Sequence, residues 1–542
     1  MAPQVALSDS TFPNIDAMRR DSTPDGRDSI QVTVHIRRPV ESGFPSFAEL
    51  CSPDHRHISR EEFAAKHSAA AADVAAVKAF AKASGLRVVS TDALQRAITL
   101  VGTIDACNAA FGVELQHFGH PSGHTFRSHR GPIHVPEGLK DIVEGVVGLS
   151  NPSIPRRHPR RSTGERSDSP PVSQSYWPNE VASFYSFPGS TGQGECIGII
   201  ELGGGYYESD LDAYWQEIQA NFPSFSPPRV GSVGSNTPNP NDPTDGEVAL
   251  DIDVAGAVAY GANVVVYFPS SSVIRSLSDP SIVNTIFVPE QELLDTVSAA
   301  IHDKINQPSV LSISYGWTES FNSRSFLIKL NQLFEDAAAL GITVFVSAGD
   351  NGSYGGNGTP HIPQNIEANT PASCPAIVSV GGTQLDVRDG RLIGERVWND
   401  LTRSGGATGG GFSGVYIQAP VQAGSVASYI ERYPQYADRA KYRAIPDIAS
   451  EAAPGTGYKV FVNDAWQTVG GTSASAPLWA ALTALINEKL VGDGKQRLGL
   501  ATRYLYDPAC VAALNKVTPE GGNGLPGEAY PEAPGWNPCT GL

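Results

Sequence analysis

The most constraining feature of this 542-residue chain is the segment Gly-Gly-Thr-Ser-Ala-Ser-Ala-Pro at residues 470–477, followed by Leu-Trp-Ala-Ala-Leu-Thr-Ala-Leu-Ile. The pattern predicts a glycine-led turn at the start of a buried helix, where outward-pointing N–H groups favour developing negative charge. A nucleophilic serine is commonly presented in this way, and Ser473 is the candidate. The alternative is that Thr472 or Ser473 only caps the helix, as hydroxyl residues often do before an apolar run.

The histidines are poorly placed to serve as the base that a serine nucleophile needs. Ten of the 12 precede residue 171, which leaves His302 and His361 in the rest of the chain. His302 lies in a helical pattern where we expect a surface imidazole, and His361 lies in a loop next to proline. The sequence therefore favours a base other than histidine.

Two carboxyl groups within residues 246–260 are candidates for that base. The segment is rich in alanine and aliphatic residues, which predicts a helix packed on most sides, and a carboxylate inside such a helix is costly unless it is paired or used. Glu247 and Asp251 are four residues apart and share a helix face, so they can share protons. Asp253 is expected to face elsewhere. The alternative, a solvated acidic face, fits poorly because nearly every other residue is apolar.

Three more candidates follow strand-like segments, at positions where sites form in open α/β sheets. Asp350 ends the run Ile-Thr-Val-Phe-Val-Ser-Ala-Gly-Asp, Glu201 ends Cys-Ile-Gly-Ile-Ile-Glu, and Tyr315 ends Ser-Val-Leu-Ser-Ile-Ser-Tyr. The alternative for Asp350 is an ordinary turn aspartate, which the sequence Asp-Asn-Gly favours.

Together these segments resemble the sedolisin, or serine-carboxyl peptidase, family, and within it the kumamolisins. Five motifs carry the resemblance, in the order Ile-Ile-Glu-Leu-Gly-Gly-Gly-Tyr, Gly-Glu-Val-x-Leu-Asp-Ile, Ser-Ile-Ser-Tyr-Gly, Ala-Gly-Asp-x-Gly and Gly-Gly-Thr-Ser-x-x-x-Pro. The likeness extends from about residue 28 to the C-terminus. It implies an α/β fold, with a subtilisin-like catalytic domain of parallel strands flanked by helices after a ferredoxin-like α+β prodomain.

The resemblance also implies roles for these residues in an acid-acting endopeptidase. Ser473 would be the nucleophile, Glu247 its general base and later acid, and Asp251 the group that orients Glu247. Asp350 would be protonated and would donate a hydrogen bond to the oxyanion. Glu201 would extend the proton network, in which Tyr315 replaces the tryptophan of the kumamolisins.

The chemistry of these groups favours an acidic pH optimum. An imidazole with a pKa of about 6.5 is protonated in acid, whereas a carboxyl group titrating near about pH 4 can still accept a proton from serine.

Two other classes of protein are alternatives to a serine-carboxyl peptidase. A histidine-dependent subtilase would show a neutral-to-alkaline optimum, and a catalytically impaired binding protein would lack the four central residues, which are present here.

Charge and composition divide the chain. We expect a disordered segment at 1–27, a prodomain at 28–150, an activation linker at 151–175 and a catalytic domain at 176–542. Residues 1–170 hold 20 basic and 19 acidic side chains, whereas residues 171–542 hold 19 and 37, which argues against nucleic acid as a partner. The expected partners are peptide substrates and the chain's own prodomain, which acts as an inhibitor of a monomeric enzyme.

The linker carries five arginines and is expected to cross the acidic active-site cleft and to be cut between residues 160 and 175; they are Arg156, Arg157, Arg160, Arg161 and Arg166. The N-terminal histidines suggest a pH trigger for this step, provided that some of them are neutral when the prodomain is docked. The candidates are His117, His120, His124, His129 and His134.

Localisation and cofactors rest on the family resemblance. No apolar run approaches the roughly 20 residues of a membrane span, and residues 1–10 lack the hydrophobic region of a signal peptide, so secretion is expected from the family alone. Family members bind calcium near the C-terminus, where this chain has Lys516, Val517, Gly535 and Asn537. Because Lys516 and Asn537 replace aspartates, we expect no calcium and no other cofactor, with the Lys516 ammonium in the place of the ion.

Overall fold

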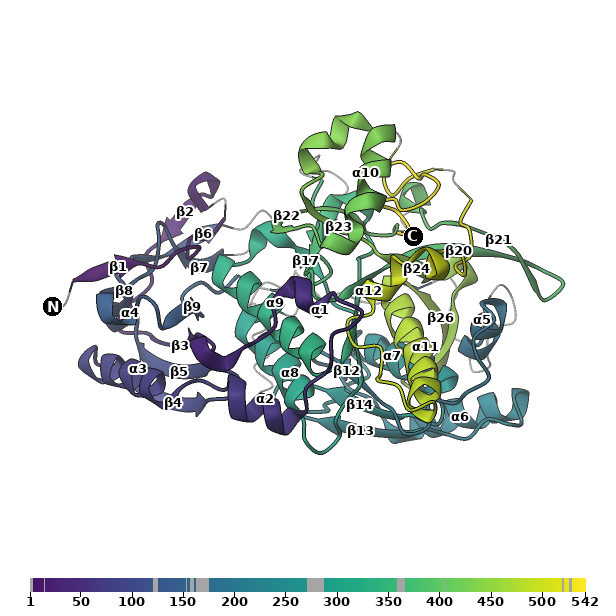
Figure 1. Cartoon of the computed structure of the whole chain (residues 1–542), viewed down its shortest axis with the longest axis horizontal. Coiled ribbons are helices and arrows are strands. Elements are labelled where there is room, and N and C mark those ends of the chain that lie inside the picture. Colours follow the sequence, from purple (N-terminus) through teal and green to yellow (C-terminus); the bar gives the residue numbers. More distant parts are fainter. Residues whose placement is uncertain are drawn as a thin grey trace.

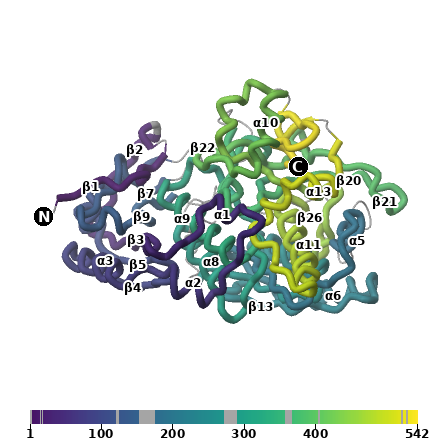
Figure 2. The backbone as a smooth tube through the Cα atoms, in the orientation of Figure 1, coloured from purple at the N-terminus to yellow at the C-terminus, as the bar shows by residue number. Residues whose placement is uncertain are grey.

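Two domains lie side by side in the computed structural model of the chain (Figure 1). The structure describes residues 3–13, 15–119, 125–152, 154–155, 160–161, 175–270, 287–357, 366–403, 405–518, 521–525 and 529–542. The N-terminal domain, purple to blue in Figure 2, packs against teal helices that belong to the larger C-terminal domain. The two domains therefore meet through a helical layer.

The N-terminal domain is built on an antiparallel sheet with the strand order β4-β5-β3-β9. Its core elements are β3 (Ser29–Ile36), α3 (Ala71–Ala83), β4 (Arg87–Asp92), β5 (Ala97–Thr103), α4 (Ile104–Phe111) and β9 (Val143–Val147). In chain order this is strand, helix, strand, strand, helix, strand, with the first strand in the centre beside the last. That arrangement confirms the ferredoxin-like prediction.

The N-terminal segment is ordered in its described part, so the expectation of disorder over 1–27 is wrong there. Strand β1 (Gln4–Ala6) pairs with β8 (His134–Pro136), and β2 (Arg20–Ser22) pairs with β6 (Leu115–Gly119). Three apolar side chains of the segment are buried: Leu7, Phe12 and Ile15. They are too widely spaced to produce a periodic signal, and their burial depends on strands more than 100 residues away.

The C-terminal domain is organised around an eight-stranded sheet with the order β13-β14-β12-β16-β18-β20-β21, in which β24 also pairs with β20. All neighbours are parallel except the hairpin β20–β21. The strands are β12 (Cys196–Ile200), β13 (Arg229–Val233), β14 (Asn263–Tyr267), β16 (Val310–Ile313), β18 (Thr343–Ser347), β20 (Val378–Arg388), β21 (Arg391–Val397) and β24 (Ile448–Glu451). The predicted parallel sheet is confirmed.

Helices cover both faces of this sheet. Ile197 and Ile199 of β12 join the core formed with α7 (Asp245–Val258) and α11 (Thr472–Gly492). Ile200 points to the other face and packs with α8 (Glu290–His302) and α9 (Arg324–Ala339). The side chains alternate between the two faces because side-chain direction along a strand repeats every two residues, and this strand is buried on both sides. Every residue of α7 is buried, as its sequence predicts.

Helices α8 and α9 also contact the N-terminal domain, so they lie between two sheets (Figure 1). In β3, Val32 and Val34 face the domain's own core, whereas Thr33 and His35 are buried on the opposite face. Val147 of β9 belongs to the core around α8 and α9. The N-terminal domain thus uses one sheet face for its own helices and the other for docking.

The remaining helices and strands complete the two domains. They are α1 (Phe47–Leu50), α2 (Arg60–His67), α5 (Pro178–Phe184), α6 (Glu208–Asn221), α10 (Ala423–Arg432), α12 (Thr502–Leu505), α13 (Pro508–Val511), β7 (Thr125–His129), β17 (Trp317–Thr318), β19 (Asn369–Thr370), β22 (Gly411–Ile417), β23 (Tyr442–Ile445), β25 (Tyr458–Val462) and β26 (Ala465–Gly470). All six cysteines are unpaired. Within the described ranges, none of the helices has the length and apolar character needed to cross a bilayer.

Two short strands connect the domains in the expected linker. Strand β10 (Ile154–Pro155) pairs with β15 (Phe287–Val288), and β11 (Arg160–Arg161) pairs with β26. Both pairings are antiparallel, and Arg160 lies opposite Gly470. Arg156, Arg157 and Arg166 fall outside the described residues. The backbone at 160–161 therefore lies along the strand that leads into the Ser473 helix.

Buried carboxyl groups without a cationic partner are common in the described part of the C-terminal domain. Burial raises the pKa of Glu290 to about 8 and that of Glu319 to about 7, although neighbouring hydroxyl and amide groups partly oppose the shift. Burial also raises the pKa of Asp253 and Glu451 well above the ordinary range. These groups are most compatible with the fold when they are protonated.

We predict that the C-terminal domain loses stability as the pH rises from about 4 to 8. The folded-state pKa values lie above the unfolded value of about 4, so the folded state binds more protons in this window. Each such group can cost about 1.4 kcal/mol per pH unit between its two pKa values. Melting of the Ser473→Ala chain, followed by fluorescence of the seven tryptophans, which all follow residue 171, measures this domain.

Replacement of the buried Glu290 by glutamine should flatten the pH dependence of the melting temperature. The matched control is Glu208→Gln, because Glu208 is exposed in the first turn of α6. A melting temperature that rises from pH 4 to pH 8 would contradict this prediction.

Candidate active site

Ser473 lies in the first turn of α11, immediately after the glycine turn that the sequence predicts. Gly471 adopts a φ of 115°, a conformation that favours glycine, and a Cβ there would approach Asp350 Oδ2 to 2.7 Å. The Ser473 side chain is buried, and its Oγ donates to the Ser314 carbonyl at 3.4 Å. The N-cap residue is Gly471, and neither Thr472 nor Ser473 occupies that position, so the capping alternative is not what the structure shows.

Glu247 and Asp251 both lie on α7, which packs along α11. Both are fully buried, so the alternative of a solvated acidic face is wrong. Asp253 points elsewhere, as expected: its Oδ2 accepts a hydrogen bond from the Phe461 N–H at 3.3 Å. The helix thus separates a pair of carboxyls near α11 from a third that supports β25.

Ser314, at the end of β16, connects the two catalytic helices. Its hydroxyl donates to Asp251 Oδ2 at 2.6 Å, and the same oxygen lies 3.2 Å from the Ser473 carbonyl. Burial raises the pKa of Asp251 to about 8, although the Ser314 hydroxyl partly opposes the shift. Asp251 is therefore protonated in mildly acidic solution.

Asp350 follows β18 and reaches the start of α11. Its Oδ1 accepts two hydrogen bonds from Thr472, one from the backbone N–H and one from the hydroxyl, both at 2.8 Å. The Thr472 hydroxyl in turn accepts from the Gly349 N–H at 3.0 Å. These bonds join residues 122 positions apart, so Asp350 is more than a turn residue. The other carboxyl oxygen, Oδ2, lies beside Gly471.

Tyr315 and Glu201 meet at the same edge of the sheet. The Tyr315 hydroxyl donates to Glu201 Oε2 at 2.7 Å, and both side chains are buried. Both residues are candidates in the sequence because they follow strand-like segments. The structure brings them together because β12 and β16 are adjacent and parallel.

Neither remaining C-terminal histidine has a described contact with Ser473. His302 ends α8, where its ring lies 5.2 Å from that of Phe63 in the N-terminal domain and both of its ring nitrogens are buried. The expectation of a surface imidazole is therefore wrong for His302. His361 falls outside the described residues.

Sequence reasoning missed the roles of Ser314 and Thr472. Both lie within the motifs quoted above, but their hydroxyls are defined only by contacts with Asp251 and Asp350, on separate elements. The one available signal was their position beside the motif residues Tyr315 and Ser473. It does not indicate which carboxyl each hydroxyl meets.

The C-terminal positions expected to correspond to a calcium site form a different arrangement. The Asn537 side-chain nitrogen lies among oxygens at 3.1 to 3.4 Å, namely Glu532 Oε1, Ala533 O, Gly535 O, Thr540 Oγ1 and Gly541 O. Asn537 Oδ1 accepts from the N–H groups of Cys539 and Thr540. Lys516 is exposed, so the prediction that its ammonium takes the place of an ion is wrong.

The donor set does not fit a divalent cation. Calcium prefers six to eight oxygens, including charged carboxylates, whereas here an amide N–H₂ group points into the oxygens. Burial raises the pKa of Glu532, the nearby carboxyl, to about 8. Val517 packs at the edge of the adjacent apolar cluster. Among the described residues, no group of three or more acidic, histidine or cysteine side chains is arranged to hold a metal ion.

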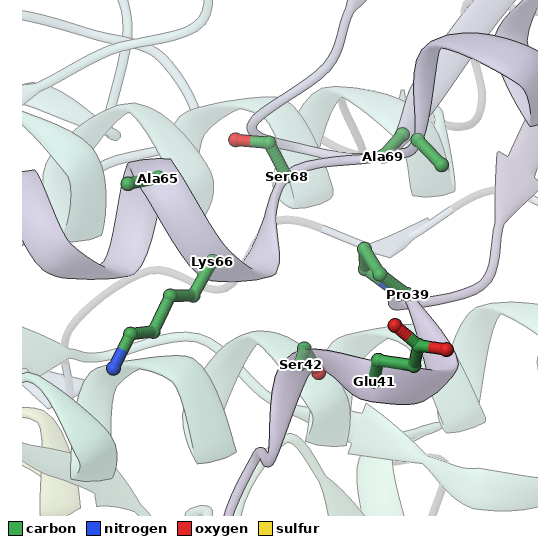
Figure 3. A pocket seen from close by; sticks show the side chains of 8 residues that line it. Pro39, Glu41, Ser42, Ala65, Lys66, Ser68 and Ala69 are labelled. Carbon is green, nitrogen blue, oxygen red and sulfur yellow. The ribbon is translucent and has the colours of Figure 1, made fainter.

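A surface hollow in the N-terminal domain lies apart from these residues (Figure 3). It lies beside α2 and the 3-10 turn η2 (Val40–Ser42), and small side chains such as Ala65, Ser68 and Ala69 form much of its lining. Lys66, on its rim, pairs with Glu62 four residues earlier. The hollow holds no arrangement of catalytic groups.

Comparisons with known proteins agree with this geometry. Residues 16–152 match the family "Pro-kumamolisin, activation domain", and residues 232–497 match the "Subtilase family". The chain is 39% identical to kumamolisin of Bacillus sp. (strain MN-32), over 95% of this chain and 90% of that protein. It is 28% identical to sedolisin of Pseudomonas sp. (strain 101), over 90% of this chain and 79% of that protein.

A solved structure supports the same assignment. Pseudomonas sedolisin, described as a serine-carboxyl proteinase complexed with pseudo-iodotyrostatin, superposes with a TM-score of 0.56 at 26% identity. The match covers 68% of this chain and 95% of that one. The chain therefore belongs to the sedolisin (serine-carboxyl peptidase) family, as a kumamolisin-like precursor in which an N-terminal prodomain precedes a serine-type peptidase domain.

Proposed function

We propose that this protein is an acid-acting serine-carboxyl endopeptidase, made as a self-processing zymogen and secreted. The observation that carries the proposal is the pair of hydroxyl–carboxyl contacts around Ser473, Ser314 with Asp251 and Thr472 with Asp350. They orient two buried carboxyls at the start of the helix that bears the nucleophile. Peptides and proteins are the proposed substrates, and the proposed enzyme is a monomer without nucleic-acid or membrane partners.

In the proposed reaction, Ser473 Oγ attacks the carbonyl carbon of the scissile peptide bond and its proton passes to the Glu247 carboxylate. The carbonyl oxygen becomes an oxyanion, to which protonated Asp350 donates a hydrogen bond from Oδ2. Glu247 then gives its proton to the leaving amine as the C–N bond breaks. In the second half, Glu247 takes a proton from water as the water oxygen attacks the acyl carbon of the ester. The bond between that carbon and Ser473 Oγ then breaks, Glu247 returns the proton to Oγ, and the peptide leaves with a new carboxyl group.

Asp251 supports Glu247 in this scheme. A protonated, neutral Asp251 on the same helix face avoids repulsion when Glu247 is ionised. Glu201 and Tyr315 are proposed to extend this network, through the hydrogen bond that they share. No step requires a metal ion.

The linker is proposed to inhibit the enzyme and then to be its first substrate. The backbone of Arg160 and Arg161 pairs in antiparallel fashion with Gly470 and Val469, which precede Ser473 by three and four residues. Peptides commonly bind sheet edges in this extended form. The pairing supports passage of the linker across the site, with cleavage between residues 160 and 175.

We expect self-processing and peptide cleavage to show an acidic optimum and to stop in Ser473→Ala. The variant should remain at full length over a series of pH values, whereas N-terminal sequencing of the active chain should place the new terminus within 160–175. A kcat/KM profile peaking above neutrality would favour a histidine-dependent mechanism instead. Undiminished cleavage by Ser473→Ala would contradict the assignment of the nucleophile. A native chain without peptidase activity would instead favour the alternative of a catalytically impaired binding protein.

We predict that Thr472→Val lowers kcat by at least about tenfold with little change in KM, because it removes a hydroxyl that orients Asp350. The matched control is Thr472→Ser, which keeps the hydroxyl and should retain most of the activity. Steady-state kinetics at the pH optimum measures both. Equal losses in the two variants would show that the methyl group, and not the hydrogen bond, matters.

We propose that the enzyme works without calcium. Asn537 supplies a neutral donor where the family uses a cation, so a chelator should change neither the melting temperature nor kcat beyond experimental error. A double replacement, Lys516→Asp with Asn537→Asp, restores two carboxylates and should make the melting temperature rise on calcium addition. Strong destabilisation of the native chain by chelator, reversed by calcium, would overturn this proposal.

A further inference from the structure

The docking surface between the prodomain and helices α8 and α9 is held by a buried ion pair. Arg96 Nη2 lies 3.1 Å from Asp336 Oδ2, and Arg38 Nη2 lies 2.7 Å from Asp336 Oδ1. Both arginines belong to the prodomain, and Asp336 belongs to α9. Burial alone would raise the pKa of Asp336, but Arg96 and Arg38 together hold it well below its usual range. This contact therefore persists in acid, so acid-driven release must come from other groups.

Three histidines lie at the same surface, and each has a cation near its ring. His35 of β3 is buried beside Lys329 and Arg96. His302 of α8 stacks near Phe63 of the prodomain, with Arg96 and Lys329 nearby. His57 packs on the backbone of Gly341 and Gly499, and its Nε2 lies 3.4 Å from Arg503 Nη2. In the described part of the chain, none of the three forms an ion pair with a carboxylate.

We propose that His35, His57 and His302 are the acid sensor that loosens the prodomain, because each is neutral when docked and gains a proton when the interface opens. The proposal rests on the zymogen part of the proposed function and adds its regulation. It also moves the sensor away from the cluster suggested by the sequence. His117 is half-buried beside Ser22, the His129 ring meets Gly131, and His120 and His124 lie outside the described residues.

The pKa values of these histidines are shifted in the direction that favours release of the prodomain in acid. Burial lowers the pKa of His35 well below its ordinary value, and the charge of Lys329 adds to this, whereas the Gln291 amide acts in the opposite sense. Burial likewise lowers the pKa of His57 and of His302 to about 4, with Arg503 adding to the first shift. A group whose pKa is lowered by docking stabilises the docked state above its free pKa and destabilises it below.

The pH dependence of docking also depends on the charged and titratable groups that face the three histidines. Those facing His35 and His302 are Arg38, His67, Asp92, Arg96, Glu144, Asp295, Lys329, Glu335 and Asp336, and those facing His57 are His55, Arg497 and Arg503. Burial raises the pKa of Asp295 to about 6 and also raises that of Glu335, so these two carboxyls favour docking in acid. Burial lowers the pKa of Lys329 well below its ordinary value, so its protonated form, like that of the histidines, favours the open interface. The two carboxyls do not cancel three histidines, whose effect begins near pH 6.5.

The size of the effect follows from proton linkage. Each histidine can weaken docking by up to tenfold per pH unit between its free pKa of about 6.5 and its docked value. Between pH 6.5 and 4.5 this amounts to at most about 50-fold for each histidine. Charge alone would act the other way, since cationic histidines attract an acidic peptidase domain. The sign is reversed only because these rings are buried beside cations.

Hydrogen exchange in the full-length Ser473→Ala chain tests the proposal without requiring catalysis. Exchange of the β3 and α9 amides, corrected for the intrinsic effect of pH, should report opening of the interface between pH 7 and pH 4. The triple variant His35→Gln, His57→Gln, His302→Gln should move the midpoint of opening down by at least about one pH unit. The matched control is His117→Gln with His134→Gln, which should leave the midpoint unchanged.

The single variant His57→Gln keeps the test decisive if the triple variant does not fold, because His57 is only half-buried. It should lower the midpoint by a smaller amount. An unchanged midpoint in the interface variants, or an equal shift in the control, would overturn the proposal. If the midpoint shifts as expected while the native chain never processes itself, the sensor stands and the proposed peptidase function fails.

Discussion

Hydrogen bonds between hydroxyl groups and buried carboxyl groups hold the catalytic apparatus together. Ser314 joins Asp251 on α7 to the end of β16, and Thr472 joins Asp350 after β18 to the start of α11. A carboxylate at such depth would be costly without a cation, but a protonated carboxyl needs only one acceptor and one donor. This cost is a physical reason for the acid action proposed for the enzyme.

The two domains use burial in opposite ways. Within the peptidase domain, buried carboxyl groups without a cationic partner make the fold more stable in acid, as the raised pKa values of Glu290 and Glu319 illustrate. At the docking surface of the prodomain, buried histidines beside cations destabilise the docked state in acid, as His57 and His302 illustrate. A fall in pH thus strengthens the enzyme while it weakens the contact with its inhibitor. Both effects follow from the same cost of placing a charge in a poorly solvated position.

In the C-terminal loop, the proposed independence from calcium rests on one amide. Asn537 donates toward carbonyl oxygens that would otherwise need a cation, and its own oxygen accepts from Cys539 and Thr540. The sequence marked Asn537 as a position where the family resemblance implies an aspartate. It assigned the compensating charge to Lys516, which the structure leaves exposed, because spacing does not reveal which of two polar side chains points inward.

The sequence by itself determined the elements and the identities of the groups at their ends. The strand ends carry Glu201, Tyr315 and Asp350, the apolar pattern of α7 marked its carboxyls as buried, and the turn at residues 470–472 marked Ser473. Local periodicity and turn chemistry are sufficient for such assignments, because they depend on neighbours a few residues away.

Only the tertiary structure decided which groups meet. It joined Thr472 to Asp350 and Ser314 to Asp251, ordered the segment before residue 28, and placed His302 against Phe63 of the prodomain. These contacts span from 60 to more than 200 positions along the chain. They follow from which strands are adjacent and which faces are buried, and no local pattern encodes those choices.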